Sequence, residues 1–407
     1  HAEHFARHFS GLARHAVGDP RALVAEVSAE FANAIVAWRC ALELRRCDWI
    51  AAMVRALWAY LENRGRQREG IELLTPALAL ADDAPEARLA QARLHHGLSM
   101  LHHRIGHHAR SLELARNGAR VAADGVDTEA WIGCHLNASS CLWAVGDPEA
   151  ALECIERGIE IARARNDAQC LAWALGNLGL ALCGAGRFDE AEASLLQALE
   201  GSRAMGDHYN VTVHLINLGG LARDRDDPAE LEAAVRWYRQ ALEHARRHDI
   251  DFFALHSAVS LANVHYLAHQ FDEARRHFED SLLPARRNGH QRIVEAIHLG
   301  LARLDLAAGD WKAARQVLAE LLATERLHLH ANPVAELVLE HAAGLVAGGE
   351  GAAAAQAYSS VLGFPTVVGS LRQLAQSALA ALPPQVRDFA GPAITIDKVV
   401  SRLLNGR

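Results

Sequence analysis

A pattern of small and large apolar residues recurs about every 40 positions along most of the chain. It is clearest in NLGLALCGAGRFDEAEASLLQALE, residues 177–200. Leu178 and Gly179 open this unit, Gly186 marks a turn, and Ala191 and Leu195 follow. Small residues stand where two helices must approach closely, and large ones stand where a side chain wedges into a neighbour. Each unit therefore predicts two helices joined by a turn.

The turn position can be followed along the sequence at nearly constant spacing. Asp226 marks a turn that is expected to be three residues longer than the others. Weaker units are predicted around Gly219 and Tyr238, around Phe271 and Phe278, from Gly309 to Leu318, and from Gly349 to Tyr358. The predicted turn positions are Gly65, Gly106, Gly146, Gly186, Asp226, His269, Gly309 and Gly349.

This alternation predicts an all-α fold, a TPR-like helical-repeat solenoid with about eight 40-residue helix pairs. Tetratricopeptide (TPR) repeats usually have 34 residues, so each helix is expected to be about one turn longer than in the common form. HEAT-like repeats share the longer period but lack the Leu-Gly and Ala-x3-aromatic positions. Stacked repeats are expected to form a right-handed superhelix with an extended concave surface.

Three segments are predicted from where the repeat begins and ends. Residues 1–48 form an N-terminal helical junction, residues 49–362 the TPR superhelix, and residues 363–407 a C-terminal group of capping helices. Pro and Gly fall between the predicted helices, as in Asp147-Pro148 and Asp227-Pro228, where they are compatible with helix starts and turns.

The amino-acid composition argues against some classes of protein function. The hydrophobic fraction is 51% and the charged fraction 22%, which is typical of a well-packed globular protein. A net charge of −8 argues against direct nucleic-acid binding. Seven Cys without a CxxC pair favour a reducing compartment. The sequence has no apolar run of about 18 residues and no N-terminal signal pattern, so no membrane contact and a cytoplasmic location are expected.

Segments outside the clear repeats resemble a known family. HAEHFARHF, EVSAEFANAIVAWRCALE and ALWAYLENRGRQREGIELLTPALALA resemble the junction that follows the nucleotide-binding core of bacterial signal-transducing ATPases with numerous domains (STAND). The closing LPPQVRDFAGPAITIDKVVSRLL is similar to the last helix of those proteins. The chain starts at His1 within a helical pattern, which predicts that it is part of a longer polypeptide.

The resemblance implies a sensor role. In that family the TPR arm binds a protein, peptide or small-molecule inducer, and occupancy releases the upstream nucleotide-binding domain of the same polypeptide to oligomerise. GxxxxGK[ST] is absent, and the only lysines are Lys312 and Lys398, neither of which follows a glycine-rich turn. We therefore expect no ATP hydrolysis, no other catalytic activity and no cofactor from this chain.

Six histidines gather in HHGLSMLHHRIGHH, residues 95–108. His96 and His103 share a helix face, and His107 and His108 follow the turn, so a transition metal is conceivable. A closed zinc site, however, usually shows ligands four residues apart or a thiolate partner, and neither is obvious here. Solvated or capping histidines without metal are preferred. Cys134 and Cys141, which also share a helix face, are interpreted as packing residues.

A row of asparagines suggests a binding surface. Asn137, Asn177 and Asn217 recur every 40 residues beside the Leu-Gly position, on the face expected to line the inner groove. Their amides could bind an extended peptide backbone, or could instead tie each helix to its neighbour. Helical phase places further candidates in the same groove: Arg93, His96, Trp143, Trp173, His214, His256, Asn263 and Arg303.

The leading hypothesis is a non-catalytic TPR sensor or protein-interaction domain of a STAND-type transcriptional or signalling regulator. A free-standing TPR adaptor or peptide receptor is the alternative, because it would have the same fold. A metal-dependent enzyme is the distant third hypothesis.

Overall fold

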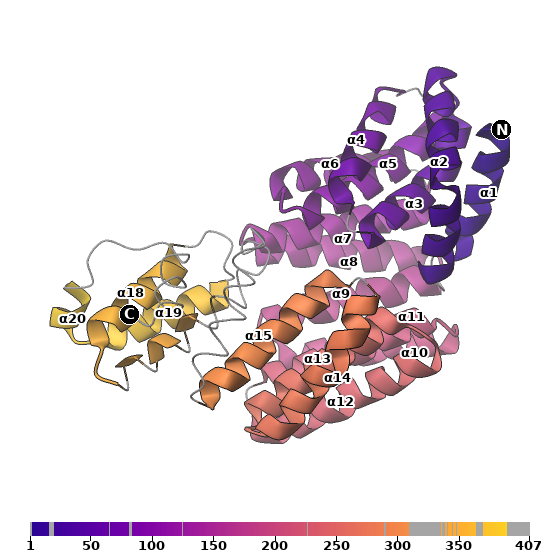
Figure 1. Ribbon diagram of the computed structural model, residues 1–407. Helices are drawn as coiled ribbons and strands as arrows, with labels where there is room; N and C mark the ends of the chain where they lie inside the picture. The colour runs from indigo at the N-terminus through magenta and orange to yellow at the C-terminus, as the bar shows by residue number, and fades with distance from the viewer. Residues whose placement is uncertain are drawn as a thin grey trace. The chain divides into compact units, whose positions relative to one another are not determined.

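The computed structural model describes residues 2–308 except 16–19, 65, 81–83, 124, 226 and 289, and most of residues 335–388. The described residues form helices and turns, without strands. The chain divides into two compact units, His1–Phe253 and Ala254–Arg407. The predicted turns at Gly65 and Gly309, the unit from Gly309 to Leu318 and the closing segment 389–407 lie outside the described residues. Helices of the first unit pack antiparallel to their neighbours in Figure 1.

The N-terminal helices share one hydrophobic core. Phe9, Trp38 and Leu57 are fully buried in it. The indole of Trp38 donates to the Leu73 carbonyl over 3.0 Å, which satisfies its one polar atom. The α-helix Gln67–Leu74 ends shortly before Pro76 and gives way to a 3-10 turn, because proline has no backbone N–H to donate to a further helical hydrogen bond. The elements are α1 (Ala2–His15), α2 (Pro20–Glu43), α3 (Cys47–Asn63), α4 (Gln67–Leu74) and η1 (Thr75–Leu80).

The repeating part of the first unit consists of helices joined by turns of three to five residues. From Thr128 to Pro228, helices begin every 20 residues, which is half of the predicted period. The bounds are α5 (Pro85–Arg104), α6 (His108–Ala122), α7 (Thr128–Ala144), α8 (Pro148–Ala164), α9 (Ala168–Gly184), α10 (Phe188–Ala204), α11 (His208–Asp224) and α12 (Pro228–Arg247).

Aspartates and left-handed residues set where these helices start and stop. Asp147 and Asp167 each accept a hydrogen bond from a backbone N–H in the first turn of the following helix. Gly146 and Gly186 have φ of 85° and 74°, a conformation that glycine adopts at no steric cost. The turn position followed in the sequence is therefore the residue just past the end of each first helix.

The small and large positions of the repeat meet as predicted. A Cβ atom added to Gly179 would lie 2.5 Å from Leu195 and 3.1 Å from the Ala191 carbonyl oxygen, so only glycine permits α9 and α10 to approach this closely. Gly219 has the same relation to Tyr238 on α12. The predicted TPR-like packing is confirmed at these positions.

One detail of the predicted repeat is wrong. The three extra residues expected in the turn near Asp226 instead lengthen the following helix, because α12 spans 20 residues and α10 spans 17. The turn between α11 and α12 is as short as its counterparts. Ala241, Leu242 and Ala245 of α12 are buried as Ala198, Leu199 and Ser202 of α10 are, so the longer helix keeps the same packing face.

The second unit contains further helices of the same kind and a separate C-terminal core. A Cβ atom at Gly300 would lie 2.1 Å from the fully buried ring of Phe278, which repeats the glycine-to-large contact. Tyr358 and Val361 belong to the C-terminal core. The described helices are α13 (Asp251–Leu267), which contains the unit boundary, α14 (Phe271–Arg287), α15 (Gln291–Ala307), α18 (Gly351–Leu362), α19 (Gly369–Ala381) and α20 (Pro384–Asp388).

The first helices of successive pairs pack against one another as well as against their own partners. In the first unit α5 contacts α7, α7 contacts α9, and α9 contacts α11. The helices α3, α5, α7, α9 and α11 thus form one row. We call the surface that their side chains form along this row the first-helix face. Among the described residues, no helix is long and apolar enough to span a bilayer.

Candidate functional site

Three aromatic side chains from different helix pairs converge on the first-helix face. The ring centroids of Trp58 on α3 and His96 on α5 are 5.4 Å apart, and those of His96 and Trp173 on α9 are 6.3 Å apart. The intervening helix α7 contributes Gly133, where an added Cβ atom would lie 2.3 Å from His96 Nε2. The missing side chain at Gly133 therefore makes room for this aromatic cluster.

Two ion pairs lie beside the aromatic cluster. Arg93 Nε donates to Asp127 Oδ2 over 2.7 Å, and its Nη1 donates to the Ala51 carbonyl over 2.7 Å. Arg55 pairs with Glu129 over 2.8 Å. With Trp58, His96 and Ala130, these side chains line a cavity of about 10 Å³, which has room for at most one water molecule.

Two of the predicted groove histidines are buried. His96 is 5% exposed and His214 is 2% exposed, and burial lowers the pKa of each to about 4. His214 packs over Gly176 of α9, 2.5 Å from where a Cβ atom would lie, and both of its ring nitrogens lack hydrogen-bond partners within the described part of the chain. The expectation that they project into an open groove is wrong, because a glycine on the neighbouring first helix lets each ring sink between helices.

The asparagine row does not behave as a unit. Asn137 is 4% exposed, and its amide donates to Ser99 Oγ over 2.7 Å and to the His96 carbonyl over 3.3 Å. The prediction of an open groove amide is wrong at Asn137, which ties α7 to α5. Asn177 is half-buried and donates only to the Trp173 carbonyl of its own helix among the bonds found, and Asn217 is also half-buried.

We predict that this difference appears in stability. Asn137→Ala removes donors from two buried acceptors and should lower the free energy of unfolding by about 1–1.5 kcal/mol. Asn177→Ala is the matched control and should change it by less than about 0.5 kcal/mol. Urea unfolding followed by tryptophan fluorescence measures both, and equal losses would remove the distinction between the two amides.

The predicted tryptophans occupy different environments. The ring of Trp143 lies over Gly184, where an added Cβ atom would be 2.4 Å from Cζ2, so Trp143 packs the carboxyl ends of α7 and α9 together. Trp173 is half-buried in the aromatic cluster. Leu180, which follows Asn177 by three residues on the same helix, is 50% exposed. Trp173, Asn177 and Leu180 thus form a stripe at helical spacing on α9.

The remaining predicted groove residues lie in the second unit. His256 is exposed on α13, and Asn263 on the same helix is half-buried. The Arg303 guanidinium lies 4.5 Å from the centroid of the Tyr266 ring, a cation–π contact between α15 and α13.

Sequence reasoning missed Arg55, Trp58, Asp127 and Glu129. Asp127 occupies the position just before a helix where aspartates recur in this chain. Its carboxylate accepts a hydrogen bond from the Ala130 backbone N–H. That capping role gives no indication of its second partner, Arg93. These residues pair across three helices at spacings unrelated to the repeat, so only the fold brings them together.

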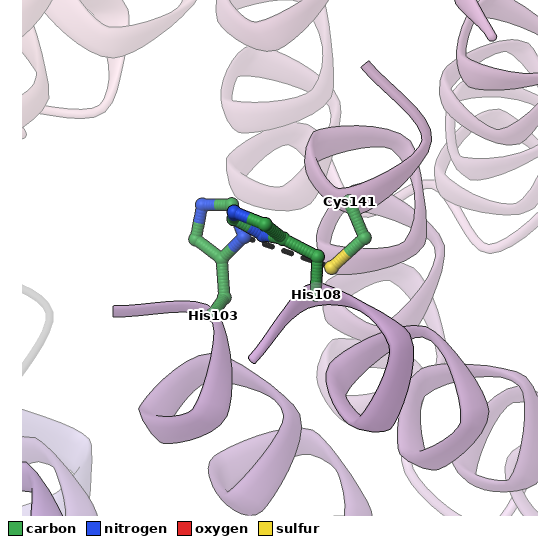
Figure 2. A group of neighbouring side chains, drawn as sticks. All are labelled: His103, His108 and Cys141. Atoms are coloured by element: carbon green, nitrogen blue, oxygen red, sulfur yellow. Dashed lines mark hydrogen bonds between the residues drawn. The ribbon is translucent and has the colours of Figure 1, made fainter. Parts of the chain in front are cut away.

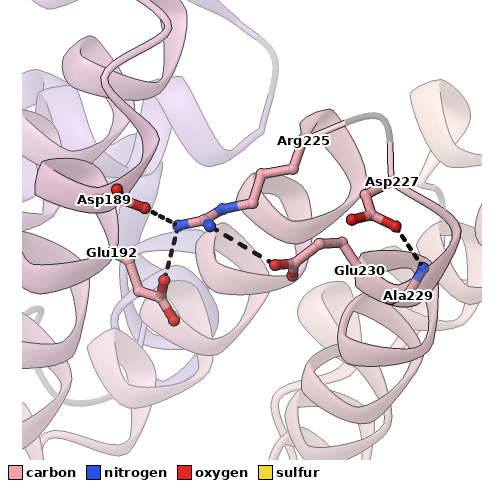
Figure 3. Close-up of polar contacts among 6 residues, drawn as sticks. All are labelled: Asp189, Glu192, Arg225, Asp227, Ala229 and Glu230. Carbon is pink, nitrogen blue, oxygen red and sulfur yellow. Dashed lines mark hydrogen bonds and ion pairs between the residues drawn. The ribbon is translucent and has the colours of Figure 1, made fainter.

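Arg225 forms a separate polar network at the turns (Figure 3). It contacts Asp189 at 3.0 Å, Glu192 at 2.8 Å and Glu230 at 3.6 Å, while Asp227 caps α12. The network borders an open cavity of about 320 Å³. Because one cation links α10, α11 and α12, we interpret it as a tie between helix pairs. Each surface ion pair of this kind contributes little to the free energy of unfolding.

Two clusters within the described residues have side chains that could hold a metal ion. One contains His103, His108 and Cys141, and the other His208, His244 and His248. In each cluster the possible ligand atoms lie within 4.8 Å of one another. Burial raises the pKa of the Cys141 thiol, and its hydrogen bond to Ser111 opposes that rise.

Comparison with family models identifies the repeat. A MalT-like TPR region matches residues 165–359, and the model for anaphase-promoting complex subunit 5 matches residues 85–134 and 133–181. No curated protein matches the sequence. The predicted resemblance to a TPR sensor arm is confirmed by the first of these matches.

Solved structures give the same fold. A Rap protein complexed with competence and sporulation factor is 11% identical, with a TM-score of 0.57 over 92% of this chain and 99% of that one. Aspartyl phosphate phosphatase F from Bacillus subtilis is 12% identical, with a TM-score of 0.54 over 94% of both chains. A STAND protein with a TPR sensor from Pyrococcus horikoshii is 14% identical, with a TM-score of 0.48 over 79% of this chain and 47% of that one. The chain thus has the fold of TPR-type helical-repeat proteins, and its residues 165–359 match a MalT-like TPR region.

Proposed function

We propose that this chain is a non-catalytic sensor arm that binds an extended peptide or protein segment on its first-helix face. The observation that carries the proposal is the stripe of Trp173, Asn177 and Leu180. Leu180 exposes half of its surface there, and Trp173 and Asn177 are half-buried beside it on the same helix. An exposed apolar side chain beside amide and indole groups offers both hydrophobic contact and backbone hydrogen bonds to a ligand.

The next first helix extends this surface. Val213, Asn217 and Gly220 lie on α11 at the positions that correspond to Trp173, Asn177 and Leu180, and all three are half-buried. A Cβ atom at Gly220 would have only the Tyr238 hydroxyl within 4 Å, so α11 is open at this position. Peptide side chains could lie against Leu180 and Val213, while the two amides bond to the peptide backbone. In a Rap protein of the same fold the ligand is competence and sporulation factor, which supports a binding role for such a fold.

The wider role that we propose is the sensor arm of a STAND-type signalling regulator. It is supported by the MalT-like TPR match and by the resemblance of the N-terminal and C-terminal segments to that family. Ligand binding would then control an upstream nucleotide-binding domain. The free-standing peptide receptor has comparable support, because the same fold occurs in the Rap protein. The coding sequence upstream of His1 separates them: a phosphate-loop ATPase favours the first, and a start codon or a small helix-turn-helix module favours the second.

Selection from a random linear peptide library on the immobilised chain tests the binding proposal. We expect selected peptides to be rich in apolar residues and to bind with micromolar or tighter affinity. Hydrogen exchange with and without a selected peptide should show new protection in α9 and α11. Failure to select any peptide, or protection confined to α8, α10 and α12, would exclude the first-helix face as the binding surface.

A further inference from the structure

A mixed histidine and cysteine cluster lies where α5, α6 and α7 meet. His103 is in the last turn of α5, His108 begins α6, and Cys141 lies near the carboxyl end of α7. Figure 2 shows the two imidazoles side by side with the Cys141 sulfur directed toward them. All three possible ligand atoms lie within 4.8 Å of one another. The fold thus supplies the thiolate partner that the spacing of the histidines does not reveal.

One separation within the cluster matches that of a tetrahedral zinc site. Cys141 Sγ and His103 Nδ1 are 3.6 Å apart. Zn–N bonds of about 2.0–2.1 Å and a Zn–S bond of about 2.3 Å would place N and S about 3.6 Å apart on a tetrahedron. This pair therefore already has the separation that one shared zinc ion requires.

The third ligand and the surroundings agree with this geometry. Nδ1 of His108 is buried and has no hydrogen-bond partner among the described residues, which is costly for a polar atom unless something binds it. The centroids of the His103 and His108 rings are 5.2 Å apart. The Cys141 thiol donates to Ser111 Oγ over 3.0 Å, and Ser111 Oγ donates to the Ser99 carbonyl. Once the thiol has lost its proton to bind zinc, the same hydroxyl is placed to donate to the sulfur as an outer partner.

We propose that His103, His108 and Cys141 bind one Zn²⁺ ion and leave its fourth position to solvent. Both histidines are only partly buried, so the ion can enter from the α5–α6 turn. One thiolate and two imidazoles are ligands that zinc accepts in three-ligand sites. Binding would link three helices next to the first-helix face and stabilise the first unit.

The second histidine cluster is less suited to the same role. The rings of His208 and His248 are stacked, with centroids 3.6 Å apart and planes at 14°. Stacked rings direct their nitrogens nearly parallel to one another, not toward a common point. That cluster also contains no thiolate, which gives the two sites different spectroscopic signatures.

Titration of the reduced, chelator-treated full chain with Co²⁺ tests the proposal. We expect a near-ultraviolet thiolate-to-cobalt charge-transfer band that saturates at one equivalent and is removed by added Zn²⁺. Cys141→Ser should abolish the band, whereas Cys183→Ser, which removes a thiol distant in sequence and outside the cluster, should retain it. His108→Gln, at a partly exposed position, should weaken cobalt binding by at least about 10-fold.

Circular dichroism of each variant separates loss of a ligand from loss of the fold. If Cys141→Ser does not fold, His108→Gln and the wild-type band decide the question. The absence of a charge-transfer band in wild type, or its persistence in a folded Cys141→Ser variant, would overturn the proposal. Cobalt absorption without that band would place the ion on nitrogen ligands such as His208, His244 and His248 and would overturn it equally.

Discussion

The first unit is expected to lose about 5 kcal/mol of stability between pH 6.5 and pH 4 through two buried histidines. His96 and His214 have pKa values lowered to about 4 by burial, and an unfolded histidine has a pKa of about 6.5. Below pH 6.5 the unfolded chain therefore binds protons that the folded chain excludes, and stability falls as pH falls. Each histidine contributes about 2.5 kcal/mol to this loss, and the remainder is lost as the pH falls through 4.

Urea unfolding at a series of pH values measures this effect. Seven of the eight tryptophans lie in His1–Phe253, so fluorescence reports mainly on the first unit. His214→Leu removes one buried titrating group whose ring nitrogens make no hydrogen bond in the described structure, and it should reduce the loss by about 2.5 kcal/mol. A substitution of the exposed His4, which lies in the same unit, serves as the control. An unchanged pH dependence in His214→Leu would show that this ring is not buried in its neutral form.

The second large effect is expected at Gly133. Alanine there should destabilise the first unit by about 1–3 kcal/mol, because the new methyl group would lie 2.3 Å from His96 Nε2 in the aromatic cluster. Gly158 on α8 is the matched control, since a Cβ atom there would meet its nearest neighbour at 3.7 Å. Gly158→Ala should stabilise by up to about 1 kcal/mol through helix propensity alone.

The opposite signs of these two substitutions are the informative result. Both replace a buried glycine inside a helix, so backbone effects are alike and the difference reports on packing. Thermal and urea unfolding of the two variants measure it. Stabilisation by both alanines would mean that His96 and Trp173 do not depend on the space at Gly133.

Local chemistry made much of the fold predictable. The close approach of two helices at Gly179 and Leu195 was predictable, because a repeat places the same small and large residues at a fixed interval. Gly146 and Gly186 marked turns because those positions require a left-handed conformation. The added turn of α12 was not predictable in the same way, since three inserted residues extend either a loop or an amphipathic helix.

The site was less predictable because register alone does not fix side-chain direction. Asn137 and Asn177 occupy equivalent positions, yet Asn137 turns to Ser99 and the His96 carbonyl on α5. The partner offered by the preceding helix decides the outcome, and no periodic pattern contains it. The sequence pattern likewise predicts only that Cys141 lies on a packed helix face. Its approach to His103 depends on how α5 and α7 pack against each other.

The affinity of a selected peptide for an Asn177→Ala/Asn217→Ala double variant tests the central claim most directly. Isothermal titration should show binding weakened by at least about 5-fold, because each amide contributes about 0.5–1.5 kcal/mol as a backbone partner. Asn33→Ala, on an exposed face of α2, is the matched control and should bind like wild type. Unchanged affinity in the double variant, with its fold intact, would contradict the assignment of the first-helix face as the ligand surface.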